Sequence, residues 1–255
     1  ALMLRTVKIV KHQGRQYIKD LQKATLPLLH NGLPEISSKL CPDTCTSCVE
    51  ICPAEAISKN PLTVNLGQCV FCGECGRCTE GIIRFTNNFR VATNDSSYLA
   101  VSFETDHIIF DPESVRKEIR MVFGRSLKLR LVSDGSCNGC ELELNATDNV
   151  NFDMSRYGIE FVASPRHADG IVVTGPLVEN SAKALELTWA AIPDPKLLIA
   201  VGACAISGGV FKNSKALNRS FFEKNKPDLY IPGCPPHPLT IIDGLLKLTG
   251  RIKPI

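Results

Sequence analysis

The distribution of twelve cysteines constrains this 255-residue chain more than any other feature. Eight of them fall between Cys41 and Cys78, and the other four are spread from Cys137 to Cys234. A disulfide framework would spread its cysteines over a small, loop-rich secreted chain, whereas clustered cysteines in a larger chain are typical of metal ligands in a reducing compartment. The spacing therefore predicts metal ligation.

The overall composition is that of an ordinary globular protein, with 44% hydrophobic and 22% charged residues, so neither disorder nor a membrane span is indicated. The net charge is +3 and no long block of Lys or Arg stands out, which gives no support to nucleic acid as a partner. The longest apolar stretch, residues 197–207, is shorter than the ~20 residues that span a bilayer. No secretory signal opens the sequence, and we expect a chain that does not anchor itself in a membrane.

Composition and patterning divide the chain into four predicted segments. These are an N-terminal arm (1–40), a compact cysteine-rich domain with an internal repeat (41–90), a linker (91–126) and a second domain (127–255). In the arm, basic residues are interspersed with apolar ones. That pattern suits a solvated arm that covers a partner or the following domain, and it also suits a helix on a membrane surface.

After residue 126, short apolar runs alternate with helical stretches, which is typical of a parallel sheet covered by helices. The predicted strands are 127–132, 159–162, 171–174, 197–201 and 229–231. The clearest predicted helices are 179–192 and 238–248, and in the linker Asp111, Pro112 and Glu113 predict the start of one more. We expect an α/β domain with a parallel, flavodoxin-like sheet.

The first eight cysteines form two runs of closely spaced thiols, Cys41 to Cys52 and Cys69 to Cys78. Two-cluster ferredoxins use the run C-x2-C-x2-C-x3-C-P twice, and the fourth cysteine of each run binds the other cluster. We therefore expect an α+β, ferredoxin-like domain with two 4Fe–4S clusters. The predicted ligands are Cys41, Cys45, Cys48 and Cys78 for cluster A, and Cys52, Cys69, Cys72 and Cys75 for cluster B.

The two runs depart from the ferredoxin pattern in two places. Three residues rather than two separate Cys41 from Cys45, and only two separate Cys75 from Cys78, which lacks the trailing proline. The assignment of ligands around Cys41 and Cys78 therefore stays open. Zinc is the alternative metal, because C-x2-C knuckles also build four-thiolate zinc sites, although usually with knuckles further apart. The residues expected to shield the clusters from water are Ile57, Val64, Phe71, Ile82 and Phe85.

The last four cysteines each lie just past a predicted strand. Cys137 and Cys140 form a C-x2-C pair in GSCNGCELE, Cys204 lies in GACAISGG, and Cys234 lies in PGCPPHP. Loops at the carboxyl ends of parallel strands meet in one crevice, so these four thiolates can form a single site, cluster C. The alternative, cysteines that only pack in a core, leaves their glycine- and proline-rich loops unexplained. Glycines that would let the backbone approach a cluster are Gly135, Gly139, Gly202, Gly208, Gly209 and Gly233.

The motifs GSCNGCELE, GACA-x-x-GG and GCPP resemble the small subunit of nickel–iron hydrogenases. The likeness is to the shorter version in membrane-bound, complex I-related hydrogenases such as Ech hydrogenase and formate hydrogenlyase, and it covers residues 123–253. The related subunit of respiratory complex I has two adjacent cysteines where Cys137 and Cys140 are separated by two residues, which favours the hydrogenase side. Because the first half resembles the two-cluster ferredoxin-type subunit of the same complexes, the chain resembles a fusion of two subunits.

The resemblance implies an electron-transfer subunit whose three 4Fe–4S clusters serve the nickel–iron site of a separate large subunit. The chain itself would hold no nickel ligand and no catalytic residue. Implied partners are that large subunit, further soluble and integral membrane subunits, and an electron donor or acceptor such as ferredoxin or formate dehydrogenase. The complex would lie in the cytoplasm at the inner face of the cell membrane.

Two polar residues near cluster C invite separate interpretations. Glu143 matches an acidic position of the family near the large subunit, where it would move a proton or hydrogen-bond across the interface; an ordinary Glu in the first turn of a helix is the alternative. His237 follows the Cys234 loop, and we expect it to cap or hydrogen-bond rather than bind metal, because cluster C already has four thiolates.

Two other functions stay open. The same pair of subunits could serve a complex I-like quinone-linked or other non-hydrogenase oxidoreductase, which a large subunit without nickel-binding cysteines would indicate. A free-standing electron carrier, or an iron–sulfur or zinc scaffold, belongs to another class. Stable purification without partners would indicate that class.

Overall fold

The computed structural model of the chain describes residues 2–14, 16–38, 45–78 and 81–252. Cys41 lies outside these residues. The strands are β1 (Pro34–Ile36), β2 (Ile57–Ser58), β3 (Thr63–Asn65), β4 (Ile83–Phe85), β5 (Ala100–Val101), β6 (Leu127–Ser133), β7 (Ile159–Phe161), β8 (Gly170–Thr174), β9 (Leu197–Val201) and β10 (Leu229–Ile231). The α-helices are α1 (Leu2–Gln13), α2 (Ser47–Glu50), α3 (Lys117–Phe123), α4 (Gly139–Ala146), α5 (Glu179–Ala190), α6 (Ala203–Ser207), α7 (Ser220–Lys224) and α8 (Pro238–Leu248).

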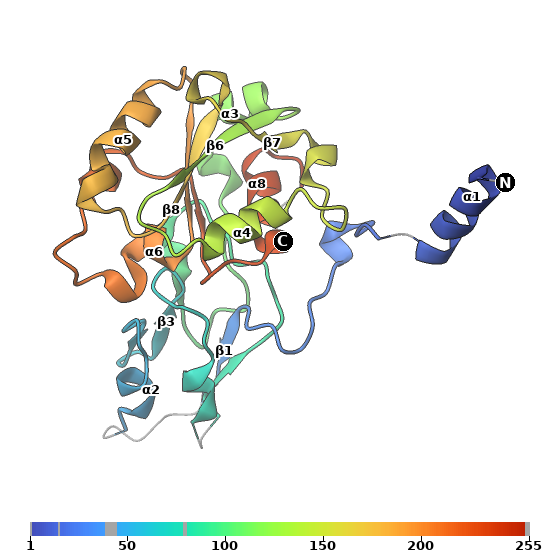
Figure 1. Ribbon diagram of the computed structural model, residues 1–255. Helices are drawn as coiled ribbons and strands as arrows, with labels where there is room; N and C mark the ends of the chain where they lie inside the picture. Colours follow the sequence, from blue (N-terminus) through green and yellow to red (C-terminus); the bar gives the residue numbers. More distant parts are fainter. Residues whose placement is uncertain (1, 15, 39–44, 79–80, 253–255) are drawn as a thin grey trace.

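Five strands form one parallel sheet in the order β10-β9-β8-β6-β7, with helices on both of its faces (Figure 1). Numbered along the domain, this order is 2-1-3-4-5, which is the flavodoxin-like order. The predicted parallel sheet is therefore confirmed, and each of the five predicted strands overlaps an observed one. The order reverses between β6 and β8, and such a switch point opens a crevice at the carboxyl ends of the strands.

Alternating side chains along the central strands bury against different helices. Leu197 and Ile199 of β9 belong to the core that includes α8, while Leu198 packs with α5 and α7 on the other face. Every residue of α8 is buried, including the ion pair between Lys247 Nζ and Asp243 Oδ2 at 2.8 Å. Helix α8 is thus an internal element that the first half of the chain covers.

The first half contains two small antiparallel sheets. Strand β1 pairs with β4, and β3 pairs with both β2 and β5. Strand β5 comes from the predicted linker, and Thr93 of the same segment forms an antiparallel bridge to Tyr230 of β10. Residues 91–126 therefore contact both halves of the molecule.

The linker helix begins later than its capping sequence predicts. The Asp111 carboxylate does accept a hydrogen bond from the Glu113 N–H at 2.9 Å, but it caps only a short 3₁₀ helix, Pro112–Ser114. Val115 and Arg116 then adopt extended backbone angles before α3 starts at Lys117. The interruption buries Val115 in the core and lets Arg116 reach Asp228.

Candidate functional site

The four cysteines of the second half lie at the carboxyl edge of the parallel sheet. Cys137 and Cys140 occupy the loop after β6 and the first turn of α4, and Cys204 lies in α6 directly after β9. Cys234 lies in the loop between β10 and α8. The β6 loop flanks the switch point of the sheet, and open α/β sheets usually bind their ligands in the crevice at that point.

Electrostatic interactions connect these four thiols. Burial, and after it the neighbouring charges of Glu141, Cys204, Cys234 and Cys137, raise the pKa of Cys140 to about 12. The pKa of Cys204 is also raised, first by burial and then by Cys234 and Cys137. Each thiol therefore lies within electrostatic reach of the others, as a shared site requires.

The site is open on one side. Cys137 and Cys234 are exposed, whereas Cys140 and Cys204 are partly buried. Exposed apolar side chains follow two of these cysteines in the sequence, with Leu142 61% exposed and Phe211 49% exposed. The thiols thus stand at a surface that also presents apolar side chains, rather than inside a closed core.

A glycine makes room for one of the sulfurs. Gly202 has a φ of +90°, which disfavours any other residue, and a Cβ at this position would lie 2.6 Å from the Cys140 Sγ. The chain leaving β9 can therefore pass close to the Cys140 thiol only because residue 202 has no side chain.

Glu141 is a site residue that the sequence interpretation missed. Its carboxylate is buried and accepts hydrogen bonds of 2.6 Å each from the hydroxyls of Ser136 and Thr174. Burial opposes ionisation, but the hydrogen bonds from Ser133, Ser136 and Thr174 outweigh it and lower the pKa. The available signal was helical spacing: Glu141 lies three residues before the fully buried Leu144, so both point to the core side of α4.

Glu143, the acidic residue chosen from the sequence, lies on another side of α4. Its side chain is partly buried, and this burial raises the pKa of the carboxyl group. His237 caps α8: its Nδ1 accepts a hydrogen bond from the Leu239 N–H at 3.1 Å. The predicted capping role of His237 is confirmed.

The thiols assigned to cluster B also lie together. Burial raises the pKa of Cys69 to about 12, with smaller contributions from Cys75, Cys52 and Cys72. Burial likewise raises the pKa of Cys75 to about 11, with contributions from Cys52, Cys72 and Cys48. Cys52 of the first run is thus a neighbour of two cysteines of the second run, Cys69 and Cys75.

Backbone donors and apolar side chains surround the cluster B thiols. The Phe71 N–H donates to the Cys69 Sγ at 3.3 Å, and the Ala56 N–H donates to the Cys52 Sγ at 3.2 Å. The predicted shielding residues belong to the same apolar group as Cys69 and Cys75. N–H donors aimed at sulfur and an apolar shell are the features that suit a buried, negatively charged iron–sulfur cluster.

The structure describes three of the four cysteines assigned to cluster A. Cys45 and Cys48 lie just before and within α2, and Cys78 follows the 3₁₀ helix η2 (Glu74–Arg77), which contacts α2. The fourth, Cys41, lies outside the described residues. Within the described parts of the chain, no three His, Cys, Asp or Glu side chains are arranged to hold a single metal ion.

An electrostatic interaction between thiols connects the two halves. The pKa of Cys234 is raised first by burial, then by Cys137 and by Cys72 of the first half. Cys72, which is assigned to cluster B, therefore lies near Cys234, which is assigned to cluster C.

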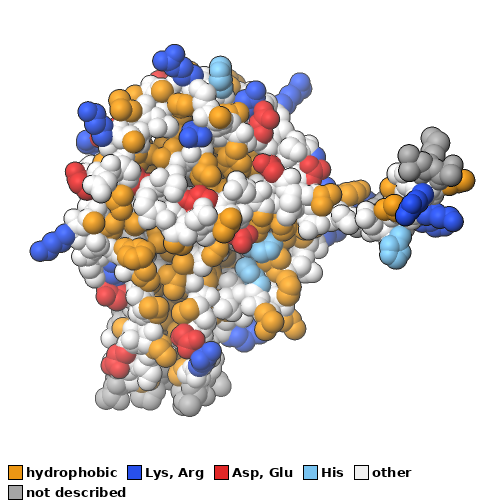
Figure 2. Space-filling model, viewed as in Figure 1, with side chains coloured by type: hydrophobic (Ala, Val, Ile, Leu, Met, Phe, Trp, Pro, Cys, Tyr) orange, Lys and Arg blue, Asp and Glu red, His pale blue; other side chains and the backbone are white. Residues whose placement is uncertain are grey.

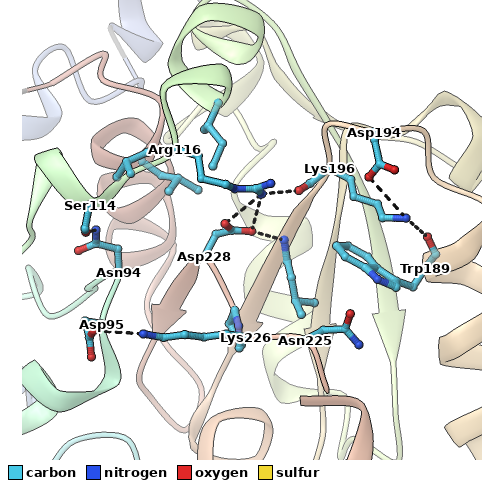
Figure 3. Close-up of a pocket in the computed structure, with 15 residues that line it drawn as sticks. Asn94, Asp95, Ser114, Arg116, Trp189, Asp194, Lys196, Asn225, Lys226 and Asp228 are labelled. Carbon is cyan, nitrogen blue, oxygen red and sulfur yellow. Dashed lines mark hydrogen bonds and ion pairs between the residues drawn. The ribbon is translucent and has the colours of Figure 1, made fainter. Parts of the chain in front are cut away.

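A cleft lies at the opposite, amino edge of the sheet (Figure 3). It measures about 430 Å³, and each of its basic side chains is paired with an aspartate. Arg116 Nη2 lies 3.1 Å from Asp228 Oδ1, and Lys226 Nζ lies 3.2 Å from Asp95 Oδ2. These pairs join the linker to the residues just before strand β10 of the α/β domain. The cleft therefore marks the contact between the linker and the α/β domain, which we call the seam.

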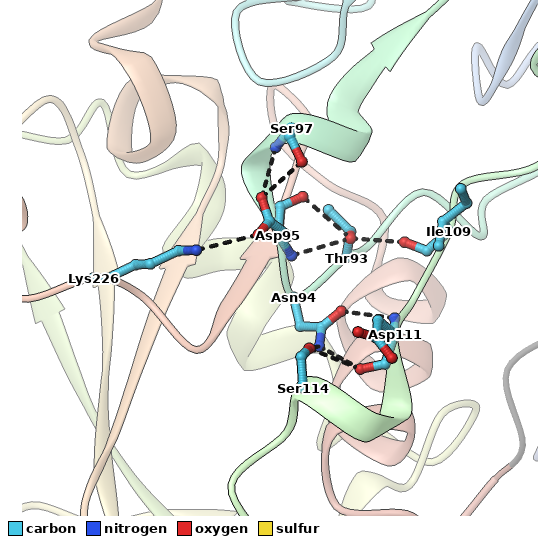
Figure 4. Close-up of polar contacts among 8 residues, drawn as sticks. All are labelled: Thr93, Asn94, Asp95, Ser97, Ile109, Asp111, Ser114 and Lys226. Atoms are coloured by element: carbon cyan, nitrogen blue, oxygen red, sulfur yellow. Dashed lines mark hydrogen bonds and ion pairs between the residues drawn. The ribbon is translucent and has the colours of Figure 1, made fainter.

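The linker side of the seam is held by side-chain amide and hydroxyl groups (Figure 4). Asn94 accepts a hydrogen bond from the Asp111 N–H at 3.0 Å and donates to the Asp111 carbonyl at 2.7 Å. The Thr93 hydroxyl donates to the Ile109 carbonyl at 2.7 Å. This network fixes the two ends of the loop between residues 93 and 111.

Comparison with known proteins gives the class of this molecule. The family model described as NADH ubiquinone oxidoreductase, 20 kDa subunit, matches residues 137–248, a range that contains all four cluster C cysteines. The fold and this match define a subunit of an oxidoreductase related to complex I. Residues before 137 lie outside the matched range.

Individual relatives come from both branches that the motifs suggested. A probable membrane-bound hydrogenase subunit from Pyrococcus furiosus is 42% identical over 134 residues, which cover 51% of this chain and 80% of the relative. Formate hydrogenlyase subunit 7 from Escherichia coli is 35% identical, over 62% of this chain and 61% of the relative. A subunit of NADH-quinone oxidoreductase from Heliobacterium modesticaldum is 42% identical, over 45% of this chain and 66% of the relative.

The chain belongs to the NADH ubiquinone oxidoreductase 20 kDa subunit family, and it matches the membrane-bound hydrogenase relative across most of that relative's length. The prediction of an oxidoreductase subunit of this complex I-related group is confirmed.

Proposed function

We propose that this chain is the electron-transfer subunit of a multisubunit nickel–iron hydrogenase. In this role it carries electrons through three 4Fe–4S clusters to or from the nickel–iron site of a separate large subunit. The observation that carries the proposal is the gathering of the cluster B thiols and of the cluster C thiols, with Cys72 near Cys234. When bound, the clusters supply one-electron redox chemistry; the chain supplies ligands, donors to sulfur and a shell that limits water.

The residues fit the proposed clusters. Cluster C would be held by Cys137, Cys140, Cys204 and Cys234. Cluster B would be held by Cys52, Cys69, Cys72 and Cys75, and cluster A by Cys41, Cys45, Cys48 and Cys78. Two backbone N–H groups point at sulfurs of cluster B, and Gly202 leaves space beside a sulfur of cluster C. Sulfur ligands with N–H donors favour iron–sulfur chemistry over an oxygen-binding metal.

The cysteine sets lie in a defined order. We call the cysteines assigned to clusters A, B and C sets A, B and C. Cys48 of set A raises the pKa of Cys75 of set B, and Cys72 of set B raises the pKa of Cys234 of set C. In this proposal set B stands between the other two. In the proposed complex, set A would face the electron donor or acceptor, such as ferredoxin or formate dehydrogenase, and set C the large subunit.

The surface around Cys137 and Cys234 suits a permanent partner. Both thiols are exposed, and exposed apolar side chains such as Leu142 and Phe211 lie near cluster C cysteines in the sequence. Contact with a large subunit would remove these side chains and the edge of cluster C from water. Glu143, which is partly buried on the helix of Cys140, would hydrogen-bond or exchange a proton across that contact.

The proposed location is the cytoplasmic face of the cell membrane, where soluble and integral membrane subunits would complete the assembly. None of the helices in the described part of the chain has the length and hydropathy that a bilayer span requires. The membrane-bound hydrogenase relative and the hydrogenase-type C-x2-C spacing of Cys137 and Cys140 support this assembly over a quinone-linked one.

Copurification tests the proposal. The chain is tagged in its native host, and the proteins that copurify from gently solubilised membranes are sequenced and assayed for nickel. We expect a large subunit with two C-x2-C pairs, nickel, and hydrogen-dependent reduction of an artificial dye. A large subunit without those cysteines and without nickel would contradict the hydrogenase proposal and indicate a quinone-linked complex. Recovery of the chain alone, soluble and stable, would indicate a free-standing carrier.

A further inference from the structure

The N-terminal helix α1 projects away from the rest of the protein (Figure 1). The chain is fastened to the α/β domain only a few residues later. The Ile18 N–H donates to the Asn151 carbonyl at 2.8 Å, and the Arg156 guanidinium donates to the Ile18 carbonyl at 2.6 Å. Arg156 also lies over the Tyr17 ring, 5.4 Å from its centroid. The arm is thus attached at residues 17 and 18, and the helix before it does not cover the following domain.

Helix α1 has an apolar side and a basic side. Val7 and Val10, three residues apart, are 60% and 61% exposed on one side of the helix, and Ile9, which is 49% exposed, lies on the same side. Arg5, Lys8, Lys11 and His12 follow at intervals of three and four on the other side, which also carries Leu4. Residues so spaced share a helix face. Both kinds of side chain are visible on the projecting helix in Figure 2.

The charge of α1 has a single sign. The sequence LMLRTVKIVKHQ contains no Asp or Glu, so no acidic side chain of the helix offsets its basic face. Val7 and Val10 are short, and such a shallow apolar stripe flanked by cations suits burial at the boundary of headgroups and acyl chains. A basic face without acidic residues is complementary to a surface of many negative charges.

From this geometry we propose that α1 lies flat on an anionic lipid bilayer, with Val7 and Val10 toward the acyl chains and Arg5 and Lys8 among acidic headgroups. The inference rests on the proposed membrane location of the complex. It adds a direct contact between this chain and lipid, beside the integral membrane subunits. The attachment at Tyr17 and Ile18 would then tie that contact to the α/β domain.

Vesicle binding tests the inference. The full chain, reconstituted with iron and sulfide, is sedimented with vesicles of phosphatidylcholine containing phosphatidylglycerol, or of phosphatidylcholine alone. We expect binding to the anionic vesicles that weakens as salt rises. Exchanging both Arg5→Gln and Lys8→Gln should weaken it about 25-fold, from roughly fivefold per basic residue. The double variant Val7→Glu and Val10→Glu should weaken it at least roughly tenfold through lost apolar burial.

Matched controls use exposed residues elsewhere. The charge control is Lys183→Gln with Lys224→Gln, and the apolar control is Leu187→Glu, whose native side chain is 62% exposed on α5. The controls should bind as the wild type does. Equal losses in controls and α1 variants, or no binding of the wild type at low salt, would overturn the inference. The inference would also be overturned if the α1 variants still bind vesicles but no longer bind a second copy of the chain or a copurifying subunit.

The iron content of every variant is measured in the same samples. A variant that loses vesicle binding with its full iron content isolates the lipid contact from the electron-transfer proposal. If the wild type fails to bind vesicles and still carries its iron, the lipid contact is wrong and the proposed electron-transfer function stands.

Discussion

The thiol of Cys72, in the first half of the chain, lies close enough to Cys234, in the second half, to raise its pKa. The two cysteine-bearing halves of the molecule therefore bring thiols together here. If Cys72 and Cys234 bind neighbouring clusters, these two clusters are magnetically coupled when both are reduced.

The first prediction concerns that coupling. Cys72→Ser should remove or alter cluster B and relieve the broadening of the cluster C signal in electron paramagnetic resonance spectra of the reduced protein. Cys45→Ser, which changes a predicted ligand of cluster A, is the control and should leave the cluster C signal as it is. A cluster C signal that responds to Cys45→Ser but not to Cys72→Ser would reverse the proposed order of the cysteine sets.

The second prediction concerns Gly202. In Gly202→Ala the new methyl group would lie 2.6 Å from the Cys140 Sγ, at a backbone φ of +90°. We expect loss of cluster C while the other clusters remain, measured as a fall of about four irons per chain. Gly14→Ala is the control, because Gly14 also has a positive φ but has no neighbouring atom within 4 Å of the added Cβ. An unchanged iron content in Gly202→Ala would show that Cys140 is not a ligand.

The third prediction concerns the seam. Arg116→Ala removes hydrogen bonds to Asp228 and to the Lys196 carbonyl, and it leaves a mostly buried carboxylate without its cation. We expect the free energy of unfolding to fall by about 1–3 kcal/mol in urea titration. Lys224→Ala breaks an ion pair with Glu186 whose side chains are 68% and 51% exposed, and it should cost less than about 1 kcal/mol. Equal effects would mean that the seam adds nothing beyond an ordinary surface ion pair.

The fourth prediction concerns His237 and pH. Burial, and then the neighbouring His30, lower the pKa of His237 from 6.5 to about 4. Between these values the unfolded chain binds a proton that the folded chain does not, so stability from this group is complete above pH 6.5 and is lost as pH falls toward 4. His237→Asn keeps a residue that can cap α8, and its melting temperature should fall less between pH 6.5 and pH 5. If the melting temperatures of the wild type and the variant fall equally over this pH range, the lowered pKa of His237 is wrong.

The sheet could be predicted because each of its strands is a short apolar run with a clear end. The sequence 197–201, for example, is five buried residues in a row and forms β9. The grouping of Cys204 and Cys234 followed from the same rule, since both lie directly past strands of one parallel sheet.

Other features depend on contacts that local patterns do not contain. The capping sequence at Asp111 starts only a 3₁₀ helix, because the burial of Val115 and the reach of Arg116 interrupt it. The sequence does not single out Glu141, because its hydroxyl partner Thr174 lies 33 residues away at the end of β8. No sequence pattern predicts that Cys72 in the first half lies near Cys234 in the second half.

The iron content of the reconstituted chain tests the central claim most directly. Three 4Fe–4S clusters require about twelve irons per chain, with matching sulfide and broad visible absorption. Cys204→Ser should lower the count to about eight and remove only the cluster C signal. Zinc in place of iron without visible absorption, or loss of all three signals in Cys204→Ser, would contradict the account.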